Sequence, residues 1–168
     1  MPLPLVRTPR LVLQPFAPED LDALQALWTD PDVRRYLWDD QVVSRSRAAE
    51  VLAGALTGAG RHGIGYWTIR QALAGEVIGD VGFQFIPQTA DVELMCCLRP
   101  QFWSLGLAAE AAGAALEYFW RTTPFPRVFA RADLPNQRSI RLMERLAMRH
   151  RKTDTALVTY ALERPEVG

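Results

Sequence analysis

The sequence has few cysteines and histidines, and it lacks a long apolar run. Its 168 residues include two cysteines and two histidines, and no apolar run approaches the ~20 residues that a membrane span requires. Cys96 and Cys97 are neighbours in a predicted strand, where successive side chains point to opposite faces, so we expect no disulfide between them. His62 and His150 are distant from any cysteine or acidic pattern, so we expect no metal site.

An excess of charge of one sign is also lacking. The 19 basic residues balance the 19 acidic residues, and Lys152 is the only lysine. A formal net charge of zero creates no field that would favour nucleic acid or a membrane surface as a partner. The first ten residues lack the basic segment and apolar core of a secretory signal, and disulfide-free cysteine usage fits a reducing compartment, so we expect a cytoplasmic protein.

Alternating strand and helix patterns predict one α/β or α+β domain over residues 1–168. Strand patterns cover 10–15, 66–70, 77–86, 92–98 and 127–132, with a closing pair within 149–162. Helical spacing of apolar residues covers 21–28, 44–56, 107–121 and 136–146, and 32–37 is a short helix or turn. No G-x-G-x-x-G turn follows the first strand, which argues against a dinucleotide-binding Rossmann domain.

The segment 92–118 organises the rest of the chain. An apolar strand, VELMCCL, breaks at Arg99 and Pro100 and is followed by an Ala-rich helix from Leu107. A helix start carries unpaired N–H groups and a partial positive charge, and the small residues Gly106, Ala108 and Ala109 would let an anion approach the backbone. Ser104 is the expected N-cap. The alternative is an ordinary strand–loop–helix with an Ala-rich packing face.

Three segments, in order along the chain, resemble the GNAT superfamily of N-acetyltransferases. NQRSIRLMERLAM (136–148) resembles the family segment N-x-x-S-x-x-x-x-E-K-x-G-F, and WSLGLAAEA (103–111) is similar to the pyrophosphate loop in its W-G-x-G-x-A-x-E-A form. TPRLVL (8–13) with WTDPDV (28–33) resembles the opening of the RimJ/RimL branch, which includes ribosomal-protein N-terminal acetyltransferases. The chain departs from the pattern at Ser104, Ala147 and Met148, and Met143 stands where other branches carry a tyrosine that protonates the departing thiolate.

The resemblance implies the GNAT fold: a mixed, mostly antiparallel sheet of about seven strands, splayed at the middle, with helices on both faces. It implies that acetyl-CoA, the cosubstrate, binds between the strands at 92–98 and 127–132, with its pyrophosphate at the helix start. The residues that the resemblance assigns to this cosubstrate are Met95, Cys96, Cys97, Leu98, Trp103, Ser104, Leu105, Gly106, Leu107, Ala108, Ala109, Asn136 and Arg141.

Transfer of an acetyl group to an amine requires a neutral amine, a polarised thioester carbonyl and a departing thiolate. A thiol pKa near ~8.5 makes the departure of the thiolate undemanding, so the absence of the tyrosine is tolerable. Glu93 is the candidate base, and its alternative is an ion pair with an arginine. Ser139 is the candidate donor to the thiolate, and its alternative is a hydroxyl bonded to the preceding helical turn. Asn136 either contacts the cosubstrate or caps the helix.

The acceptor is expected to be a primary amine, either a protein N-terminus or a small amine or amino-acid-like metabolite. Aromatic side chains in segments that wall the acceptor site in relatives are the candidate contacts: Tyr36, Trp38, Trp67 and Phe83. The predicted function is acetyl-CoA-dependent N-acetyl transfer by direct attack in a ternary complex. The alternative is a CoA-binding sensor or interaction module with little catalysis. A homodimer is compatible with the sequence.

Overall fold

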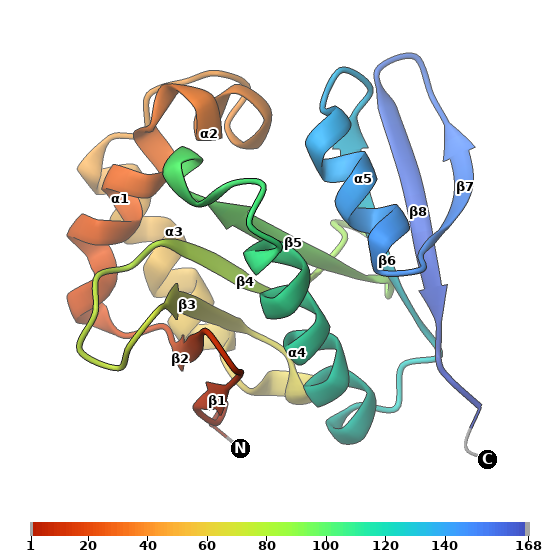
Figure 1. The fold of residues 1–168 in the computed structure, drawn as a ribbon, viewed down its shortest axis with the longest axis horizontal. Helices are drawn as coiled ribbons and strands as arrows, with labels where there is room; N and C mark the ends of the chain where they lie inside the picture. Colours follow the sequence, from red (N-terminus) through yellow and green to blue (C-terminus); the bar gives the residue numbers. More distant parts are fainter. Residues whose placement is uncertain (1, 167–168) are drawn as a thin grey trace.

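A computed structural model describes residues 2–166, which form an eight-stranded sheet with helices on both faces (Figure 1). The predicted elements are present, and the count exceeds the expected seven strands because a two-residue strand, β1, pairs with β2. The strands are β1 Val6–Arg7, β2 Val12–Pro15, β3 Tyr66–Arg70, β4 Gly79–Phe85, β5 Val92–Leu98, β6 Arg127–Asp133, β7 Arg149–Thr153 and β8 Leu157–Glu163. The α-helices are α1 Leu21–Thr29, α2 Pro31–Leu37, α3 Arg45–Gly58, α4 Leu107–Thr122 and α5 Gln137–Arg145, and short 3₁₀ turns are η1 Pro18–Asp20, η2 Arg61–Gly63 and η3 Pro100–Phe102.

The strand order is β1-β2-β3-β4-β5-β6-β8-β7, and every neighbouring pair is antiparallel except β5 and β6. Within residues 2–166, β5 and β6 share a single parallel bridge, between Glu93 and Phe129. β4 and β5, by contrast, are in register along seven residue pairs. The sheet is therefore splayed at its middle, as the resemblance implies, and the two strands diverge toward the C-terminal end of β5 (Figure 1).

Two hydrophobic clusters cover the two faces of the sheet. α4 crosses in front of the central strands (Figure 1). From α4, Phe119 stacks on Phe83 of β4 with ring centroids 4.6 Å apart. α1 and α3 build the second cluster on the other side, around Leu24, Trp28 and Leu52. Each face thus buries one of the two sets of side chains that alternate along β3, β4 and β5.

Local capping sets where the helices begin. The Asp30 carboxylate accepts hydrogen bonds from the backbone N–H groups of Asp32 and Val33 at the start of α2. Ser44 caps α3 by accepting from Arg47 N–H, and Asn136 caps α5 by accepting from Ser139 N–H. These side chains satisfy donors that have no partner within the helix.

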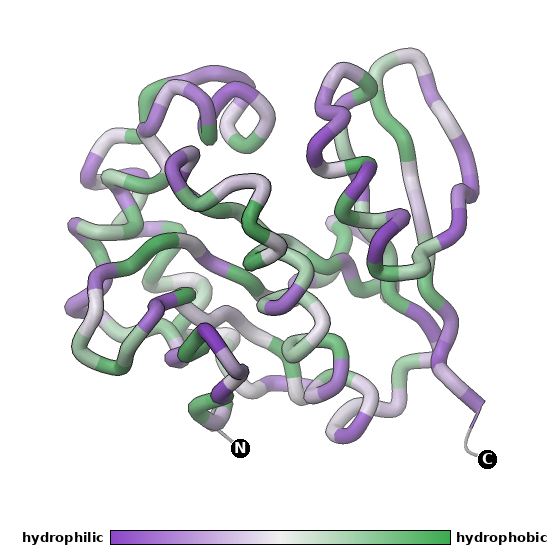
Figure 2. Tube along the Cα trace, in the orientation of Figure 1, coloured by the Kyte–Doolittle hydropathy of each residue, from purple (hydrophilic) through white to green (hydrophobic). Residues whose placement is uncertain are grey.

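The outer edge of the sheet at β7 is protected by charge. All five residues of this strand are exposed, four of them basic or imidazole side chains, and Figure 2 shows the strand as largely hydrophilic. Charged side chains on an edge strand disfavour pairing with another chain. The sheet therefore ends at β7 without an apolar edge.

Candidate active site

A cleft opens where β5 and β6 diverge, and we call it the central cleft. Its walls come from β5 and β6, the start of α4, α5 and α2, and its largest compartment, about 340 Å³, lies at the start of α4. The residues that line it include Val33, Tyr36, Met95, Cys96, Cys97, Leu98, Trp103, Ser104, Gly106, Leu107, Ala108, Ala109, Ala130, Arg131, Ala132, Asn136, Arg138, Ser139, Arg141, Leu142 and Arg145.

The start of α4 has a different cap from the one the sequence suggested. The N-cap is Gly106, with φ of 77° and no side-chain hydrogen bond, so the prediction that Ser104 caps this helix is wrong. Ser104 instead adopts φ of 61°, a second left-handed residue two positions earlier. The first turn of this 16-residue helix therefore keeps its N–H groups free of a capping side chain, beside residues that are mostly small.

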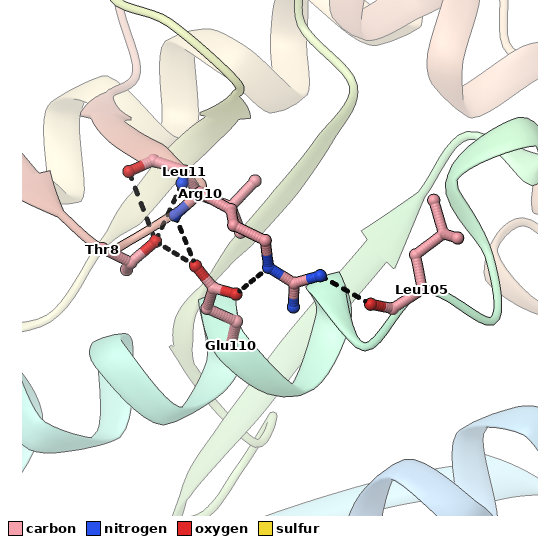
Figure 3. Close-up of polar contacts among 5 residues, drawn as sticks. All are labelled: Thr8, Arg10, Leu11, Leu105 and Glu110. Atoms are coloured by element: carbon pink, nitrogen blue, oxygen red, sulfur yellow. Dashed lines mark hydrogen bonds and ion pairs between the residues drawn. The ribbon is translucent and has the colours of Figure 1, made fainter.

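A cluster of three residues, Thr8, Arg10 and Glu110, ties the start of α4 to the segment before β2, and we call it the N-terminal clamp (Figure 3). The Glu110 carboxylate accepts from the Thr8 hydroxyl at 2.6 Å, from Arg10 backbone N–H at 2.9 Å and from Arg10 Nε at 2.6 Å. Burial alone would raise the pKa of Glu110, but these hydrogen bonds outweigh it and hold the pKa below its ordinary value.

The clamp also fixes the orientation of the loop before α4. Arg10 Nη1 donates to the carbonyl of Leu105 at 2.8 Å (Figure 3). The carbonyl of Leu105 and the N–H of Gly106 belong to one planar trans peptide and point in opposite directions. Holding the carbonyl on Arg10 therefore turns the N–H of Gly106 away from Arg10. Leu105 itself is exposed and does not line the cleft, unlike the other twelve residues assigned to the cosubstrate by resemblance.

Positive charge lines one side of the compartment at the start of α4, which we call the wide compartment. Arg138, Arg141 and Arg145 line it from α5, and no carboxylate is among its lining residues. The Arg138 guanidinium lies 3.3 Å from the centroid of the Trp103 ring, and Trp103 Nε1 donates to the Leu98 carbonyl at 2.9 Å. A ring held in this way fixes a cation at the mouth of the compartment. The compartment therefore suits a ligand with several negative charges.

Glu93 lies at the closed end of the cleft, where β5 and β6 are bridged. Its side chain is buried, and Arg131 donates to both carboxylate oxygens, at 2.5 Å from Nε and 3.2 Å from Nη2. Gln84 Nε2 donates to the same carboxylate at 3.0 Å. The hydrogen bond and charge of Glu93 raise the pKa of Arg131 against the effect of burial. The ion pair that was the alternative to a base is thus formed.

Asn136 and Ser139 project into the cleft from the start of α5. Asn136 accepts the N–H of Ser139 at 3.3 Å through Oδ1, so it is the helix cap that one alternative described. It also lines the cleft, with its amide nitrogen free of a partner among the hydrogen bonds of residues 2–166. The Ser139 hydroxyl makes no bond to the preceding turn in the described chain, whereas Thr57, Thr122 and Thr123 each make one. Its hydroxyl is therefore available to a ligand.

The two cysteines lie on β5 with neutral thiols. Burial, and then the charge of Asp80, raise the pKa of Cys96 to about 12. The same two effects raise the pKa of Cys97 well above its ordinary value. A thiol that stays protonated is a poor nucleophile, so neither cysteine is suited to carry an acetyl group. Asp80 itself is buried, accepts from Trp28 Nε1 at 2.7 Å, and has its pKa raised to about 6 by that burial.

The aromatic residues expected around the acceptor fall into three groups. Tyr36 lines the central cleft from α2. Trp38 is half-buried against Trp28, with ring centroids 5.7 Å apart, and lies outside the residues that line the cleft. Trp67 and Phe83 belong to the hydrophobic core against α4, with 0% and 1% of their surface exposed. Both side chains therefore lie outside the central cleft, and Phe83 also lines a separate cavity beneath α3.

Sequence reasoning missed several residues that the fold brings to the cleft. Arg131 and Arg145 had no assigned role, and Arg10 entered only as part of a resemblance. The sequence signal for Arg10 was present, because the TPRLVL segment places it next to a strand that pairs with the sheet. Across the described residues, no group of His, Cys, Asp and Glu side chains is arranged to hold a metal ion, and no helix is long and apolar enough to cross a membrane.

Comparison with known proteins defines the class. The family described as the acetyltransferase (GNAT) domain matches residues 10–149, and the chain belongs to this family. Its fold is the GNAT fold, and the family's reaction is acetyl transfer from acetyl-CoA. Among curated relatives, the uncharacterized N-acetyltransferase p20 of Bacillus licheniformis is 28% identical over 145 residues, which cover 83% of this chain and 79% of p20.

Solved structures share the fold at lower identity. The acetyltransferase of Agrobacterium tumefaciens str. C58 superposes with a TM-score of 0.84 at 24% identity, covering 97% of this chain and 96% of that one. RimL, a ribosomal L7/L12 alpha-N-protein acetyltransferase solved in complex with coenzyme A, superposes with a TM-score of 0.81 at 16% identity, covering 95% of this chain and 98% of that one.

Proposed function

We propose that this protein transfers the acetyl group of acetyl-CoA to a primary amine by direct attack in a ternary complex, as an N-acetyltransferase of the RimJ/RimL type. The observation that carries the proposal is the wide compartment at the start of α4. There, an uncapped helix start, small side chains and three arginines meet without an opposing carboxylate. That donor set fits the phosphates of CoA.

The remaining parts of the cleft fit the rest of the cosubstrate. The N-terminal clamp turns the N–H of Gly106 away from Arg10, and Gly106 lines the compartment. Beyond the bridge at Glu93, β5 pairs with no strand of the described residues on its β6 side, so its backbone is open to pair with the amide groups of pantetheine. A backbone N–H of the Met95–Leu98 segment would then stabilise the thioester oxygen as it gains charge.

In the reaction, the nitrogen of the neutral amine forms a bond to the acetyl carbon, and the carbon–sulfur bond breaks. The amine loses one proton and the CoA thiolate gains one, so the products are an amide and free CoA. Ser139 is the side chain that we place at the sulfur as proton donor, since its hydroxyl faces the cleft and is not engaged by its own helix.

We assign Glu93 a structural role in the cleft rather than that of the base. Three hydrogen bonds from Arg131 and Gln84 occupy its carboxylate, and 3% of its surface is exposed. The ion pair of Glu93 and Arg131 links β5 to β6 at the closed end of the cleft. A base role would require a water that reaches this carboxylate. A free α-amino group needs less help than a lysine, because its pKa is near ~7.7 rather than ~10.4.

The test is calorimetric titration with acetyl-CoA, followed by thiol release with a panel of peptides and small amines. Binding with amine-dependent thiol release supports the proposal. Binding without release across the panel favours the CoA-sensor alternative, and an absence of binding refutes the proposal.

Ser139→Ala should lower kcat while the Kd for acetyl-CoA stays within about twofold, since one hydroxyl at the sulfur contributes mainly to the departing thiolate. Glu93→Gln separates its two roles. A structural role predicts an unchanged pH dependence of kcat, whereas a base role predicts that the limb of the profile at low pH disappears.

A further inference from the structure

A second cavity, of about 460 Å³, lies beneath α3 and outside the central cleft. It is lined by α3, η2, β3 and β4, and its walls are mainly apolar, with Phe16 and Phe85 among them. α3 lies behind the sheet in Figure 1, whereas α4 crosses in front. The size is typical of pockets that hold small molecules, which range over ~300–1,000 Å³. Nothing in the mechanism above uses this cavity.

The helix that covers the cavity presents small residues to it. Val51, Gly54, Ala55 and Gly58 follow one another at helical spacing and all line the cavity. Gly54 lies in the interior of α3, where a glycine costs ~1 kcal/mol relative to alanine, and Gly58 is its last residue. A Cβ added at Gly54 or at Gly58 would have no neighbour within 4 Å, so packing does not require glycine at either position. The glycines instead leave open volume beneath the helix.

A chain of hydrogen bonds leads from this cavity to the central cleft. Tyr66 and Gln84 line the cavity, and the Tyr66 hydroxyl donates to Gln84 Oε1 at 2.6 Å. Gln84 Nε2 donates to Glu93, which is paired with Arg131, and Arg131 lines the closed end of the cleft. Burial, then the nearby charges of Asp80 and Glu93, raise the pKa of Tyr66, so its hydroxyl stays a donor.

The charge of the lining selects among amines. Arg61 and His62 lie at the wall, and no aspartate or glutamate is among the lining residues. A second ammonium group would find no carboxylate in the cavity, and burying it unpaired would be costly. An apolar body, by contrast, gains ~25 cal/mol for each Å² of its surface that the cavity removes from water.

We propose that this cavity receives the body of the acceptor, and that the acceptor is a primary amine on an aromatic or branched aliphatic body without a second cationic group. The amine end points along the Tyr66–Gln84–Glu93 chain to the closed end of the cleft. This inference rests on the proposed acetyl transfer, because it names the substrate class of that reaction.

The test compares 2-phenylethylamine, ethylamine and 1,4-diaminobutane as acceptors for the wild-type protein and for Gly58→Leu, which fills the cavity. Gly113→Leu is the matched control. It makes the same change at a helix position where a Cβ also has open space, in α4, away from the cavity. The proposal predicts that 2-phenylethylamine has the highest kcat/KM. Gly58→Leu should lower that value at least about tenfold, or ~1.4 kcal/mol, and leave ethylamine turnover and the Kd for acetyl-CoA unchanged.

Equal turnover of the three amines, or a preference for 1,4-diaminobutane, overturns the proposed substrate class. An equal effect of Gly58→Leu and Gly113→Leu overturns the location. If no amine releases thiol, the acetyl-transfer proposal fails separately. Titration of 2-phenylethylamine into the CoA-loaded protein then tests whether the cavity binds an amine. Binding that Gly58→Leu abolishes supports the cavity as an amine site, and undetectable binding to the wild type overturns it.

Discussion

Replacing Glu110 with alanine should both destabilise the protein and weaken its grip on acetyl-CoA, because this carboxylate is the centre of the N-terminal clamp. It accepts three hydrogen bonds, two of them from Arg10, while 16% of its side chain is exposed. Hydrogen bonds to a charged group contribute ~1.5–3 kcal/mol each, but half of the Arg10 side chain is exposed and solvent screens that pair. We therefore expect a net loss of about 2–3 kcal/mol in the free energy of unfolding.

The effect on ligand binding follows from the loop. Without Glu110 the Arg10 guanidinium is no longer held at the Leu105 carbonyl, and the peptide before Gly106 can rotate. We expect the Kd for acetyl-CoA to rise about tenfold, equivalent to ~1.4 kcal/mol, with kcat little changed at saturation. The assays are urea denaturation, thermal unfolding with a Tm decrease of roughly 5–10 °C, and calorimetric titration with acetyl-CoA.

Glu117→Ala is the control on the same helix. Its pair with Arg121 spans 3.4 Å, and 72% of each side chain is exposed, so its loss should cost less than about 0.5 kcal/mol. Equal effects of the two substitutions would refute the argument.

The pH dependence gives a second check on the clamp. The pKa of Glu110 is lowered in the folded protein, so its contribution is present above the unfolded pKa and is lost as pH falls through the folded one. The stability difference between the wild type and Glu110→Ala should therefore shrink in acid. Arg10→Ala should reproduce both the loss of stability and the weaker binding, and the double variant should be less affected than the sum of the two.

Three further substitutions test other parts of the structure. Ionisation of the buried Asp80 destabilises the folded protein, because its folded pKa is about 6 against an ordinary 3.8. The Asp80→Asn variant should therefore gain stability relative to the wild type as pH rises from about 4 to about 7, by up to about 3 kcal/mol. A constant difference in urea denaturation across that pH range would contradict this. Arg131→Ala should lower the free energy of unfolding by ~3 kcal/mol, because it leaves the Glu93 carboxylate buried and unpaired. Adding Glu93→Gln should restore part of that loss in urea denaturation. If stability does not recover, the loss has another cause. Gly106→Ala should lower stability by ~1–2 kcal/mol, because an alanine is strained at the φ of 77° that Gly106 adopts. The control Gly113→Ala, inside the same helix, should raise stability. Thermal unfolding compares the two variants, and equal Tm shifts would rule out backbone strain.

Most elements of the fold could be predicted because each leaves a local pattern in the sequence. The hairpin of β3 and β4 and the long helix α4 show clear periods of two and of about 3.6 residues. β1 could not be predicted in this way, since two residues are too few to show a period and only pairing with β2 defines them.

The sequence predicted where along the chain the site lies better than it predicted the contacts of the site's side chains. Small residues at the start of α4 led us to expect an anion site there, and the compartment that they line contains three arginines and no carboxylate. The cap there depends on the left-handed conformations of Ser104 and Gly106, which loop packing imposes and which a serine at a helix start does not reveal. The Glu93–Arg131 pair joins residues 38 positions apart on two strands, and no local pattern connects them.

The misplaced aromatic residues have a simple physical origin. Alternation along β3 and β4 separates two sets of side chains but does not say which helix covers which set. In this sheet the apolar set, which includes Trp67, Val81 and Phe83, packs under α4, whereas the opposite set includes the polar residues Thr68, Asp80 and Gln84. Trp67 and Phe83 were expected beside the acceptor, and the structure packs both under α4, outside the central cleft.

The single bridge between β5 and β6 gives this sheet two internal edges in addition to its two outer ones. β7 defends an outer edge with charge, but the internal edge along Met95–Leu98 is formed by an apolar strand that contains no basic residue. A bound pantetheine chain would occupy that edge as a ninth strand. The CoA-bound protein would then have less tendency than the free protein to pair this edge with a strand of another molecule.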